Sequence, residues 1–226
     1  MNDILTQSKI MNPKQFSHII WDWNGTLLDD VHCCFECINR MLARRGLKTL
    51  ENLEEYHGVF TFPVIGYYKK LGFDFEKEPF EELSVEYMDS YVHKAQAECG
   101  LHRNTEIVLA RIAESGIRQV VLSASKSDIL KEQTHRFPAC SVFEEILGND
   151  NIYANGKIEI ALDYICRAKV QKALLVGDTL HDHEVARAIG ADCVLIANGH
   201  HSRSVLRQCG AAVLDDIALL PDYIGI

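Results

Sequence analysis

The stretch Phe16–Asp30 reads Phe-Ser-His-Ile-Ile-Trp-Asp-Trp-Asn-Gly-Thr-Leu-Leu-Asp-Asp, and it decides the fold. Ser17–Trp21 is rich in Ile and aromatic side chains, which predicts a short buried strand. Gly25 then allows the backbone to turn sharply. In open α/β sheets ligands bind at the carboxyl ends of the strands. Three polar side chains are expected at such an end: Asp22, Asn24 and Thr26.

Asp22 can serve two kinds of chemistry at that position. Its carboxylate can attack phosphorus or carbon and form a covalent intermediate, or it can bind a hard cation such as Mg²⁺. A plain strand followed by an Asx turn would give the same local pattern. The segments further along the chain therefore decide between these interpretations.

The composition bounds the class of protein. A chain of 226 residues indicates one domain, or one domain with a sizeable insertion. The net charge of −9 predicts no nucleic-acid partner, because such proteins need a basic face, although one lysine and a metal ion can make a site positive for a small anionic substrate. No apolar run is long enough to span a membrane, and Met1–Pro13 is expected to be a lead-in without a signal-peptide core.

The eight cysteines, without a secretion signal, predict reduced thiols in a cytoplasmic protein. Cys33, Cys34 and Cys37 form the one cluster. Because no second ligand pair lies at a matching spacing, we expect these three side chains to belong to a helix and not to a zinc site.

Residues 31–97 show apolar side chains at helical spacing and no convincing strand. The pattern predicts helices over Val31–Leu42, from a cap at Asn52 through Tyr56, over Pro63–Leu71 and over Phe80–Ala97, with a loop from His57 to Pro63. This region predicts a helical domain of residues 30–97, inserted into a core domain of residues 1–29 and 98–226.

From Asn104 onward, helices and strands alternate. Strands are predicted at residues 118–122, 143–147, 173–176, 192–197 and 211–214, and helices at 105–115, up to about 135, at 158–169, at 182–189 and from Ser204. This alternation predicts an α/β fold with a parallel sheet and helices on both faces. Ser123 and Asp178 follow two of these strands as Asp22 follows the first, so all three should meet at one edge; Lys157 starts a helix between them.

These segments resemble, in order, the four motifs of the haloacid dehalogenase superfamily. Asp22–Thr26 is similar to the first motif, Asp-x-Asp-Gly-Thr, Ser123 to the second, Lys157 to the third, and Gly177–Asp182 to the fourth, Gly-Asp-x-x-x-Asp. The run Glu184–Ala191 matches the next helix of the phosphoglycolate phosphatase and β-phosphoglucomutase branch. The resemblance covers about residues 16–220 and implies a Rossmann-like parallel sheet plus a small helical cap domain inserted after the first strand.

The resemblance also implies an activity and a cofactor: Mg²⁺-dependent hydrolysis of a small phosphorylated metabolite. Asp22 would be the nucleophile that forms an aspartyl-phosphate. Mg²⁺ would lie between the carboxylate of Asp22, the backbone carbonyl of Asn24 and Asp178. Asp182 would hold the water shell of the metal or Lys157. A cation at this point would also relieve the repulsion between the carboxylates.

The phosphoryl group has its own implied contacts. Ser123 and the backbone N–H of Ala124 would bind the phosphoryl oxygens, and Lys157 would add positive charge. Lys126, close to Ser123, is a candidate for a second contact. Phosphoryl transfer depends mostly on positioning and electrostatic stabilisation, which such groups supply.

Asn24 departs from the family pattern. The resemblance implies an Asp at this position that gives a proton to the leaving group and later takes one from water, which an amide cannot do. General acid–base help is typically worth ~10²–10⁴-fold. Because enzymatic rate enhancements for monoester hydrolysis reach ~10²¹-fold, the loss does not abolish an enzyme.

Several alternatives follow from Asn24. The enzyme could be slow, or prefer good leaving groups such as acyl phosphates. Another group could supply the proton, and the candidates are His57, His181 and Asp29. The chain could instead bind phosphate ligands with hardly any turnover. A mutase or other phosphotransferase relies more on the missing acid, and a dehalogenase would leave the complete Gly-Asp-x-x-x-Asp motif unexplained.

The loop predicted at His57–Pro63 is where a cap would touch the substrate. His57, Phe60 and Phe62 are the candidate contacts, and the two Phe rings could stack on an apolar or ring group or serve cap packing. The sequence gives no prediction of the oligomeric state.

For three further side chains the sequence predicts a structural position only. His200 and His201 are expected in a solvated loop near the edge of the site. Trp23 either packs over the nucleophile or shapes the turn.

Overall fold

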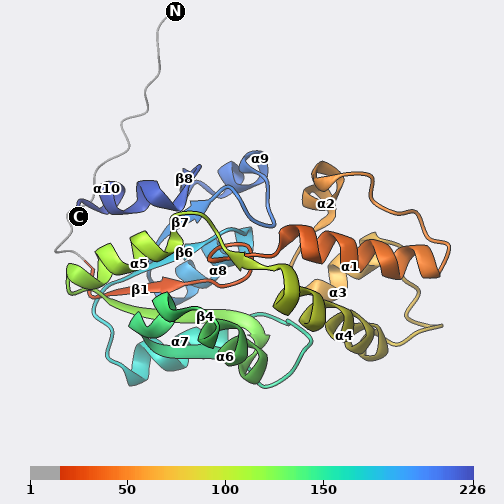
Figure 1. Ribbon diagram of the computed structural model, residues 1–226, viewed down its shortest axis with the longest axis horizontal. Coiled ribbons are helices and arrows are strands. Elements are labelled where there is room, and N and C mark those ends of the chain that lie inside the picture. Colours follow the sequence, from red (N-terminus) through yellow and green to blue (C-terminus); the bar gives the residue numbers. More distant parts are fainter. Residues whose placement is uncertain (1–15) are drawn as a thin grey trace, which may run out of the picture.

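The computed structural model describes residues 16–226; the expectation for Met1–Pro13 lies outside that part of the chain. Within it, six strands form one sheet in the order β5-β4-β1-β6-β7-β8, and every neighbouring pair is parallel. Figure 1 shows this sheet at one end of an elongated molecule and a group of helices at the other. The α/β class and the parallel sheet predicted from the alternating pattern are confirmed.

The first strand lies in the middle of the sheet, between the strands that lead to the other two predicted site segments. The bounds are β1 His18–Trp21, β4 Arg118–Lys126, β5 Phe143–Asn149, β6 Ala173–Gly177, β7 Asp192–Ile196 and β8 Ala212–Leu214. Trp21 is level with Val121 of β4 and with Val176 of β6. All three strands therefore deliver their carboxyl ends to the same place.

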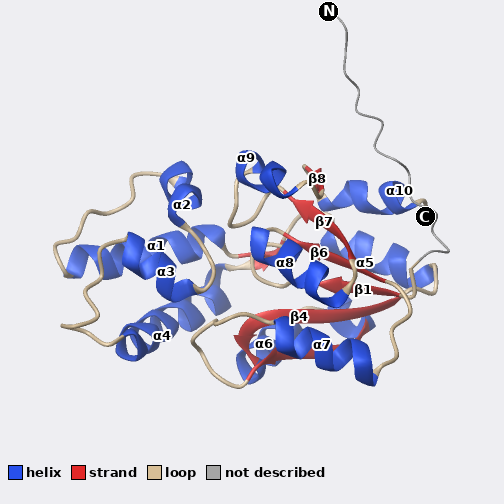
Figure 2. Ribbon diagram, turned by 180° about the vertical axis from the view of Figure 1, so that it is seen from behind, coloured by secondary structure: helices blue, strands red, loops and turns tan. Residues whose placement is uncertain are grey.

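Both faces of the sheet are buried, which explains why the strands are almost continuously apolar. Ile19 and Trp21 belong to one core cluster, which α5 and α10 cover. Ile20 belongs to the other, under α7 and α8. Figures 1 and 2 show these helix pairs on opposite sides. The helices of this part are α5 Thr105–Glu114, α6 Ser127–His135, α7 Ile158–Arg167, α8 Leu180–Ile189, α9 Arg203–Leu206 and α10 Leu220–Ile224.

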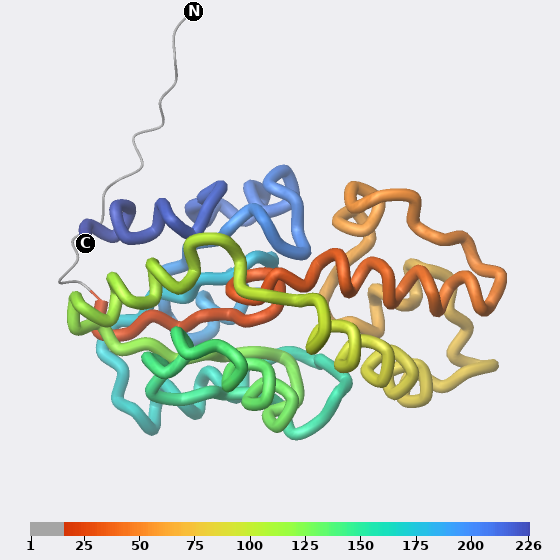
Figure 3. The backbone as a smooth tube through the Cα atoms, in the orientation of Figure 1, coloured from red at the N-terminus to blue at the C-terminus, as the bar shows by residue number. Residues whose placement is uncertain are grey.

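The helical part follows β1 directly. It consists of α1 Val31–Arg44, α2 Leu53–Val59, α3 Val64–Lys70 and α4 Phe80–Glu98. The tube in Figure 3 leaves the sheet after the first strand and returns after α4. The two segments that connect the sheet with the helical part pair as a two-stranded antiparallel ribbon, β2 Leu28–Asp29 with β3 Gly100–Leu101. No sequence pattern indicated this ribbon. The domain division at residues 30 and 97 stays a prediction.

The predicted loop from His57 to Pro63 is wrong at its start. Asn52 does cap the helix, since its side chain accepts a hydrogen bond from the Glu55 N–H, but α2 continues through Val59. Burial of Tyr56, whose hydroxyl lies 2.8 Å from His200 Nδ1, outweighs the helix-weakening effect of Gly58. His57 is therefore a helical residue, and the loop begins at Phe60.

The predicted strand over residues 118–122 is also too short. The strand β4 runs on to Lys126, with an irregular ladder to β5 after Leu122. Polar residues such as Ser123 and Ser125 ended the apolar pattern before the hydrogen-bonded strand ended. Cys33, Cys34 and Cys37 lie in α1, as predicted, and all three are buried, whereas only partial burial was expected. Within residues 16–226, no helix is long and apolar enough to cross a lipid bilayer.

A buried hydrogen-bonded pair holds the central strand. Trp21 Nε1 donates to Gln119 Oε1 at 3.0 Å, and Gln119 Nε2 donates to the carbonyl of Leu109 at 3.0 Å. We expect Trp21→Phe to lower the free energy of unfolding by about 1–3 kcal/mol, because it leaves a buried acceptor unpaired. Urea unfolding measures this loss.

A double-mutant cycle with Gln119→Met provides the control, since that variant removes the acceptor. The double variant should lose less stability than the sum of the two single variants. Strict additivity would contradict a stabilising role for this hydrogen bond.

Candidate active site

The loop after β1 turns tightly around one carbonyl group. The carbonyl of Trp23 accepts hydrogen bonds from the N–H groups of Thr26, Leu27 and Leu28. Gly25 has a φ of +72°, and a Cβ there would overlap the Asp178 carboxylate. Glycine is therefore required at this turn for two separate reasons. Trp23 is fully buried, and its Nε1 donates to Gln133 Oε1 at 2.9 Å, so its ring packs in the core.

Three carboxylates meet where β1 and β6 end. Ligand oxygens of Asp22, Asp178 and Asp182 all lie within 4.8 Å of one another, and all three side chains are buried. Thr26 joins two of them, because its Oγ1 lies 3.1 Å from Asp22 Oδ2 and 2.8 Å from Asp178 Oδ1. The convergence predicted from the strand ends is present in the structure.

One lysine faces this cluster. Lys157, at the N-terminal cap of α7, forms a short ion pair with Asp22 and lies 2.7 Å from Asp182 Oδ1. Its Nζ also donates to the carbonyl of Leu122 at 3.2 Å. Burial opposes the charge on Lys157, but Asp182 and Asp22 outweigh it and raise its pKa. The lysine is thus held as a cation between two of the three carboxylates.

The third carboxylate has no such partner. Burial raises the pKa of Asp178 well above its usual value, and the charges of Asp22 and Asp182 add to that effect against His200. Burial likewise raises the pKa of Asp22, against the opposing charge of Lys157. Three carboxylates with one lysine leave excess negative charge in a buried, all-oxygen cluster. That donor set fits a hard divalent cation.

Glycines allow the backbone to approach these carboxylates. A Cβ at Gly177 would overlap the Asp182 side chain, and one at Gly199 would overlap Asp178. The backbone N–H of His200 can therefore donate to Asp178 Oδ2 at 2.6 Å. Asp182 also completes a capping box with Thr179 at the start of α8, which fixes its orientation.

The predicted phosphate contacts lie on β4, beside β1. Ser123 and Ala124 are both buried and both line the same cavity as Asp22. The Ser123 Oγ accepts a hydrogen bond from the Ser125 N–H at 3.0 Å. Lys126 lines the cavity too, although its Nζ lies 2.8 Å from Asp128.

Asn24 is held by four side chains, three of which the sequence gave no reason to select. Its Nδ2 donates to Asp30 Oδ2 at 2.8 Å and to the Tyr91 hydroxyl at 2.7 Å. Its Oδ1 accepts from Ser125 Oγ at 2.8 Å and from Ser123 Oγ at 3.3 Å. The carboxylate of Asp30 therefore faces the one end of the amide that can donate.

Asp30 is a fully buried member of this network. It also accepts from the Gly25 N–H at 2.9 Å and lies 3.6 Å from His200 Nε2. Burial opposes its ionisation, but interactions with His200, Tyr91 and Asn24 prevail and lower its pKa. Burial also opposes the charge on His200, whereas Asp30 and Asp178 raise its pKa to about 9. The pair is a buried carboxylate and imidazolium.

The expectation that His200 and His201 lie in a solvated loop is wrong, because the helical part covers both. His200 Nδ1 lies 2.8 Å from the Tyr56 hydroxyl, and its ring stacks on Phe60 at 4.7 Å between centroids. His201 Nδ1 accepts from the Leu180 N–H at 3.0 Å, and its Nε2 lies 3.2 Å from the Phe60 carbonyl. This loop after β7 is thus a contact between sheet and helices.

A cavity of about 140 Å³ extends from the carboxylates to the helical part. Phe60 and Phe62, two of the candidate substrate contacts, line it, and so does His181, a candidate proton donor. His57 does not: it lines a separate depression together with Asp29. The reason is that successive side chains on a helix differ by about 100° in direction, so that Tyr56 faces the cavity and His57 faces away.

The fold is a Rossmann-like α/β fold, and three buried carboxylates and one lysine meet at the carboxyl edge of its sheet. Residues 19–196 match the model of the haloacid dehalogenase-like hydrolase family, and the chain belongs to this family. It is 19% identical over 217 residues to the phosphoglycolate phosphatase of Psychrobacter arcticus, covering 91% of this chain and 94% of that protein. The corresponding protein of Pseudomonas syringae pv. tomato is 23% identical over 213 residues, covering 89% and 77%.

Solved structures share the fold. A haloacid dehalogenase-like family protein from Streptococcus pneumoniae superimposes with a TM-score of 0.78 at 17% identity, covering 93% of this chain and 99% of that chain. CbbY from Rhodobacter sphaeroides, solved in complex with phosphate, gives a TM-score of 0.69 at 19% identity, covering 91% and 96%.

The pairing of Asn24 with Asp30 predicts an effect on stability. Asn24→Asp would put a second carboxyl group in contact with the buried carboxylate of Asp30, so that one must bind a proton or repel the other. We expect the free energy of unfolding near neutral pH to fall by about 1–3 kcal/mol. Urea unfolding is again the measurement.

The exchanged variant Asn24→Asp/Asp30→Asn is the matched control. It restores one amide and one carboxylate in the opposite order and should regain most of the lost stability. A double variant less stable than Asn24→Asp would refute this complementarity.

Proposed function

We propose that this chain is a Mg²⁺-dependent phosphatase that acts through an aspartyl-phosphate at Asp22. The observation that carries the proposal is the position of Asp22, at the floor of the cavity, beside Lys157 and beside two further buried carboxylates. The names of the curated relatives, phosphoglycolate phosphatases, support a small phosphorylated metabolite as substrate. The eight cysteines support the cytoplasm as the place of action.

The proposed Mg²⁺ ligands are Asp22, the backbone carbonyl of Asn24 and Asp178, with Asp182 acting through water or through Lys157. A bound divalent cation supplies charge neutralisation at the transferring phosphoryl group. The all-oxygen donor set and the excess of carboxylates over lysine at this point support the assignment.

The residues of the chain divide the reaction between them. A carboxylate oxygen of Asp22 forms a bond to phosphorus as the bond to the leaving oxygen breaks. Ser123 Oγ and the Ala124 N–H hold the phosphoryl oxygens, and Lys157 offsets their charge. Water then cleaves the phosphorus–oxygen bond to Asp22, which releases phosphate and restores the carboxylate.

The leaving oxygen needs a proton that Asn24 cannot give. Of the three candidates from the sequence, we propose His181. It lines the cavity, whereas His57 and Asp29 do not. The Nε2 of His181 is buried and has no hydrogen-bond partner among residues 16–226, and its ring is fixed by stacking on Phe62 at 4.7 Å.

The nucleophile is tested by phosphate release from p-nitrophenyl phosphate and acetyl phosphate. We expect release with Mg²⁺, none after chelation with EDTA, and a fall to the no-enzyme level in Asp22→Asn. Asp29→Asn, an exposed carboxylate outside the cavity, is the matched control and should keep the wild-type rate.

Either of two results would count against this proposal. Wild-type activity of Asp22→Asn would exclude Asp22 as the nucleophile. No release from any phosphate ester or acyl phosphate, by folded protein that binds Mg²⁺, would favour the phosphate-ligand-binding alternative.

The proton donor is tested by the dependence on the leaving group. His181→Gln should slow hydrolysis of phenyl phosphate by ~10²-fold or more, the usual size of general acid help, and slow acetyl phosphate far less, because that leaving group needs no proton. His183→Gln, on the same helix but outside the cavity, is the control. Equal slowing of both substrates would assign His181 a different role.

A further inference from the structure

The walls of the cavity above Asp22 are chiefly aromatic. The helices α2 to α4 and the loop after α2 contribute Phe60, Phe62, Tyr67, Tyr68, Phe80 and Tyr87. Val64 and Met88 fill positions between them. A surface of this composition gains most from covering an apolar or aromatic group.

These rings are held in place by one another. Phe60 stacks on His200 and lies 5.3 Å from the Tyr67 ring between centroids. Tyr87 stacks on Tyr91 at 5.8 Å. Because each ring packs against the next, the aromatic wall is preformed and does not need a ligand to assemble it.

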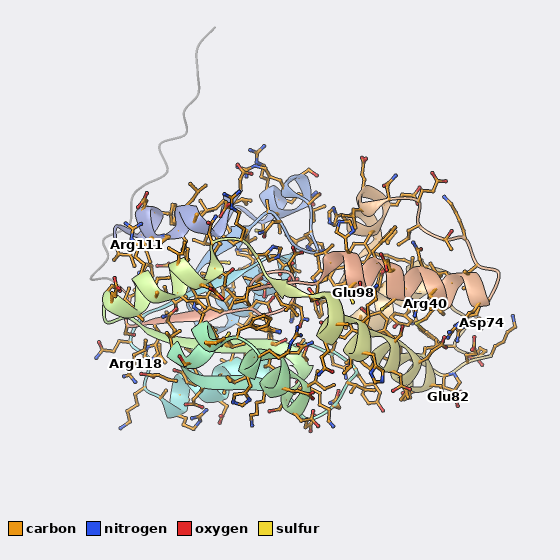
Figure 4. All side chains as sticks on the ribbon, viewed as in Figure 1. Arg40, Asp74, Glu82, Glu98, Arg111 and Arg118 are labelled. Carbon is orange, nitrogen blue, oxygen red and sulfur yellow. The ribbon has the colours of Figure 1, made fainter. Side chains whose placement is uncertain are left out.

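The basic side chains of the helical part point elsewhere. Arg45 pairs with Glu78 and Glu86, and Lys94 pairs with Glu36 and Glu98. Figure 4 shows Arg40 among the side chains on the outer surface of these helices. Among the described residues, no Lys, Arg or His of α1–α4 lines the cavity.

The basic side chains of the sheet part that line the cavity already have anionic partners. Lys157 faces Asp22 and Asp182, His200 faces Asp30, Lys126 faces Asp128, and His181 Nδ1 faces Glu184. A second anionic group on the substrate, placed beyond the phosphate, would therefore be buried against rings without a counter-charge. Burial of an unpaired charge is strongly unfavourable.

The hydroxyl of Tyr67, on the part of the wall built by α3, is a buried polar group without a partner among residues 16–226. Tyr67 is only 3% exposed, and its hydroxyl makes no hydrogen bond within the described part of the chain. Burial raises its pKa well above the usual value, so it stays a neutral hydroxyl. It can serve one uncharged polar atom of a ligand, which is compatible with an alcohol or ether but offers no charge to a carboxylate.

We propose that the substrate is a phosphate monoester whose organic group is uncharged and mainly aromatic or apolar, and that this enzyme discriminates against phosphoglycolate. The inference rests on the proposed phosphatase function and specifies its substrate class. It sets this chain apart from the activity that the names of its relatives describe.

The test compares two primary alkyl phosphates of similar leaving-group reactivity, benzyl phosphate and phosphoglycolate. With the full-length wild-type protein and Mg²⁺, we expect kcat/KM for benzyl phosphate to exceed that for phosphoglycolate by ~10-fold or more, as for other discriminations made by apolar pockets. An equal or higher value for phosphoglycolate would overturn the inference.

Hydrolysis of p-nitrophenyl phosphate in the same preparation separates this outcome from a failure of the proposed function. Mg²⁺-dependent release from p-nitrophenyl phosphate together with preference for phosphoglycolate overturns the substrate class alone. Absence of release from all three esters contradicts the phosphatase proposal on which the inference rests.

A charge placed in the wall provides a second test. Met88 and Val85 lie one turn apart on α4, but Met88 lines the cavity while Val85 is 50% exposed. Met88→Arg should shift the ratio of kcat/KM toward phosphoglycolate by ~10-fold or more, because it supplies the missing counter-charge.

Val85→Arg is the control, because it adds the same charge outside the cavity and should leave the ratio unchanged. An equal shift in both variants would show a general effect of net charge and contradict the inference; if Met88→Arg does not fold, the wild-type comparison decides.

Discussion

Crowding of three buried carboxylates against one lysine is the constraint on which the rest of this structure depends. Asp22, Asp178 and Asp182 can lie within 4.8 Å of one another because Lys157 pairs with two of them and Thr26 bridges two. Gly177 and Gly199 remove the Cβ atoms that would otherwise occupy this space. The parallel sheet supplies the geometry, since β1 and β6 are neighbours in register. The negative charge left over is what supports the proposed binding of a divalent cation at this point.

Beside this cluster, an amide and a carboxylate have complementary positions. Asn24 carries no charge, but Asp30, 2.8 Å from its Nδ2, does. His200 faces the neighbouring carboxylate of Asp30. The fold is therefore adapted to an amide at position 24, because Asp30 accepts a hydrogen bond that only the amide can donate. In the proposed reaction, the same amide leaves the proton for the leaving group to another side chain.

The sequence predicted those site residues whose positions depend on local secondary structure. Strand ends are local, so periodicity alone could place Asp22, Ser123 and Asp178 at one edge of the sheet. The place of Lys157 in the site was implied only by the family resemblance. Contacts between segments far apart in the chain produce no pattern in the sequence. Asp30 and His200 are 170 positions apart yet face each other, and His200 had the surroundings of an exposed loop. His57 was misplaced because a shift of one residue in a helix turns a side chain away from the cavity.

In this chain, the side chains proposed to react with phosphate and the side chains that form the cavity wall come from different parts of the fold. The chain is only about one fifth identical to its relatives, and the positions of its site carboxylates and lysine follow from the sheet. The aromatic wall is built by α2, α3 and α4, which the sheet does not constrain, and its rings support one another. A helical insertion with its own packing can exchange charged for aromatic side chains without disturbing the carboxylates. In our proposals, the carboxylates and the lysine at the sheet edge carry out the reaction at phosphorus, whereas the composition of the cavity wall selects the organic group of the substrate.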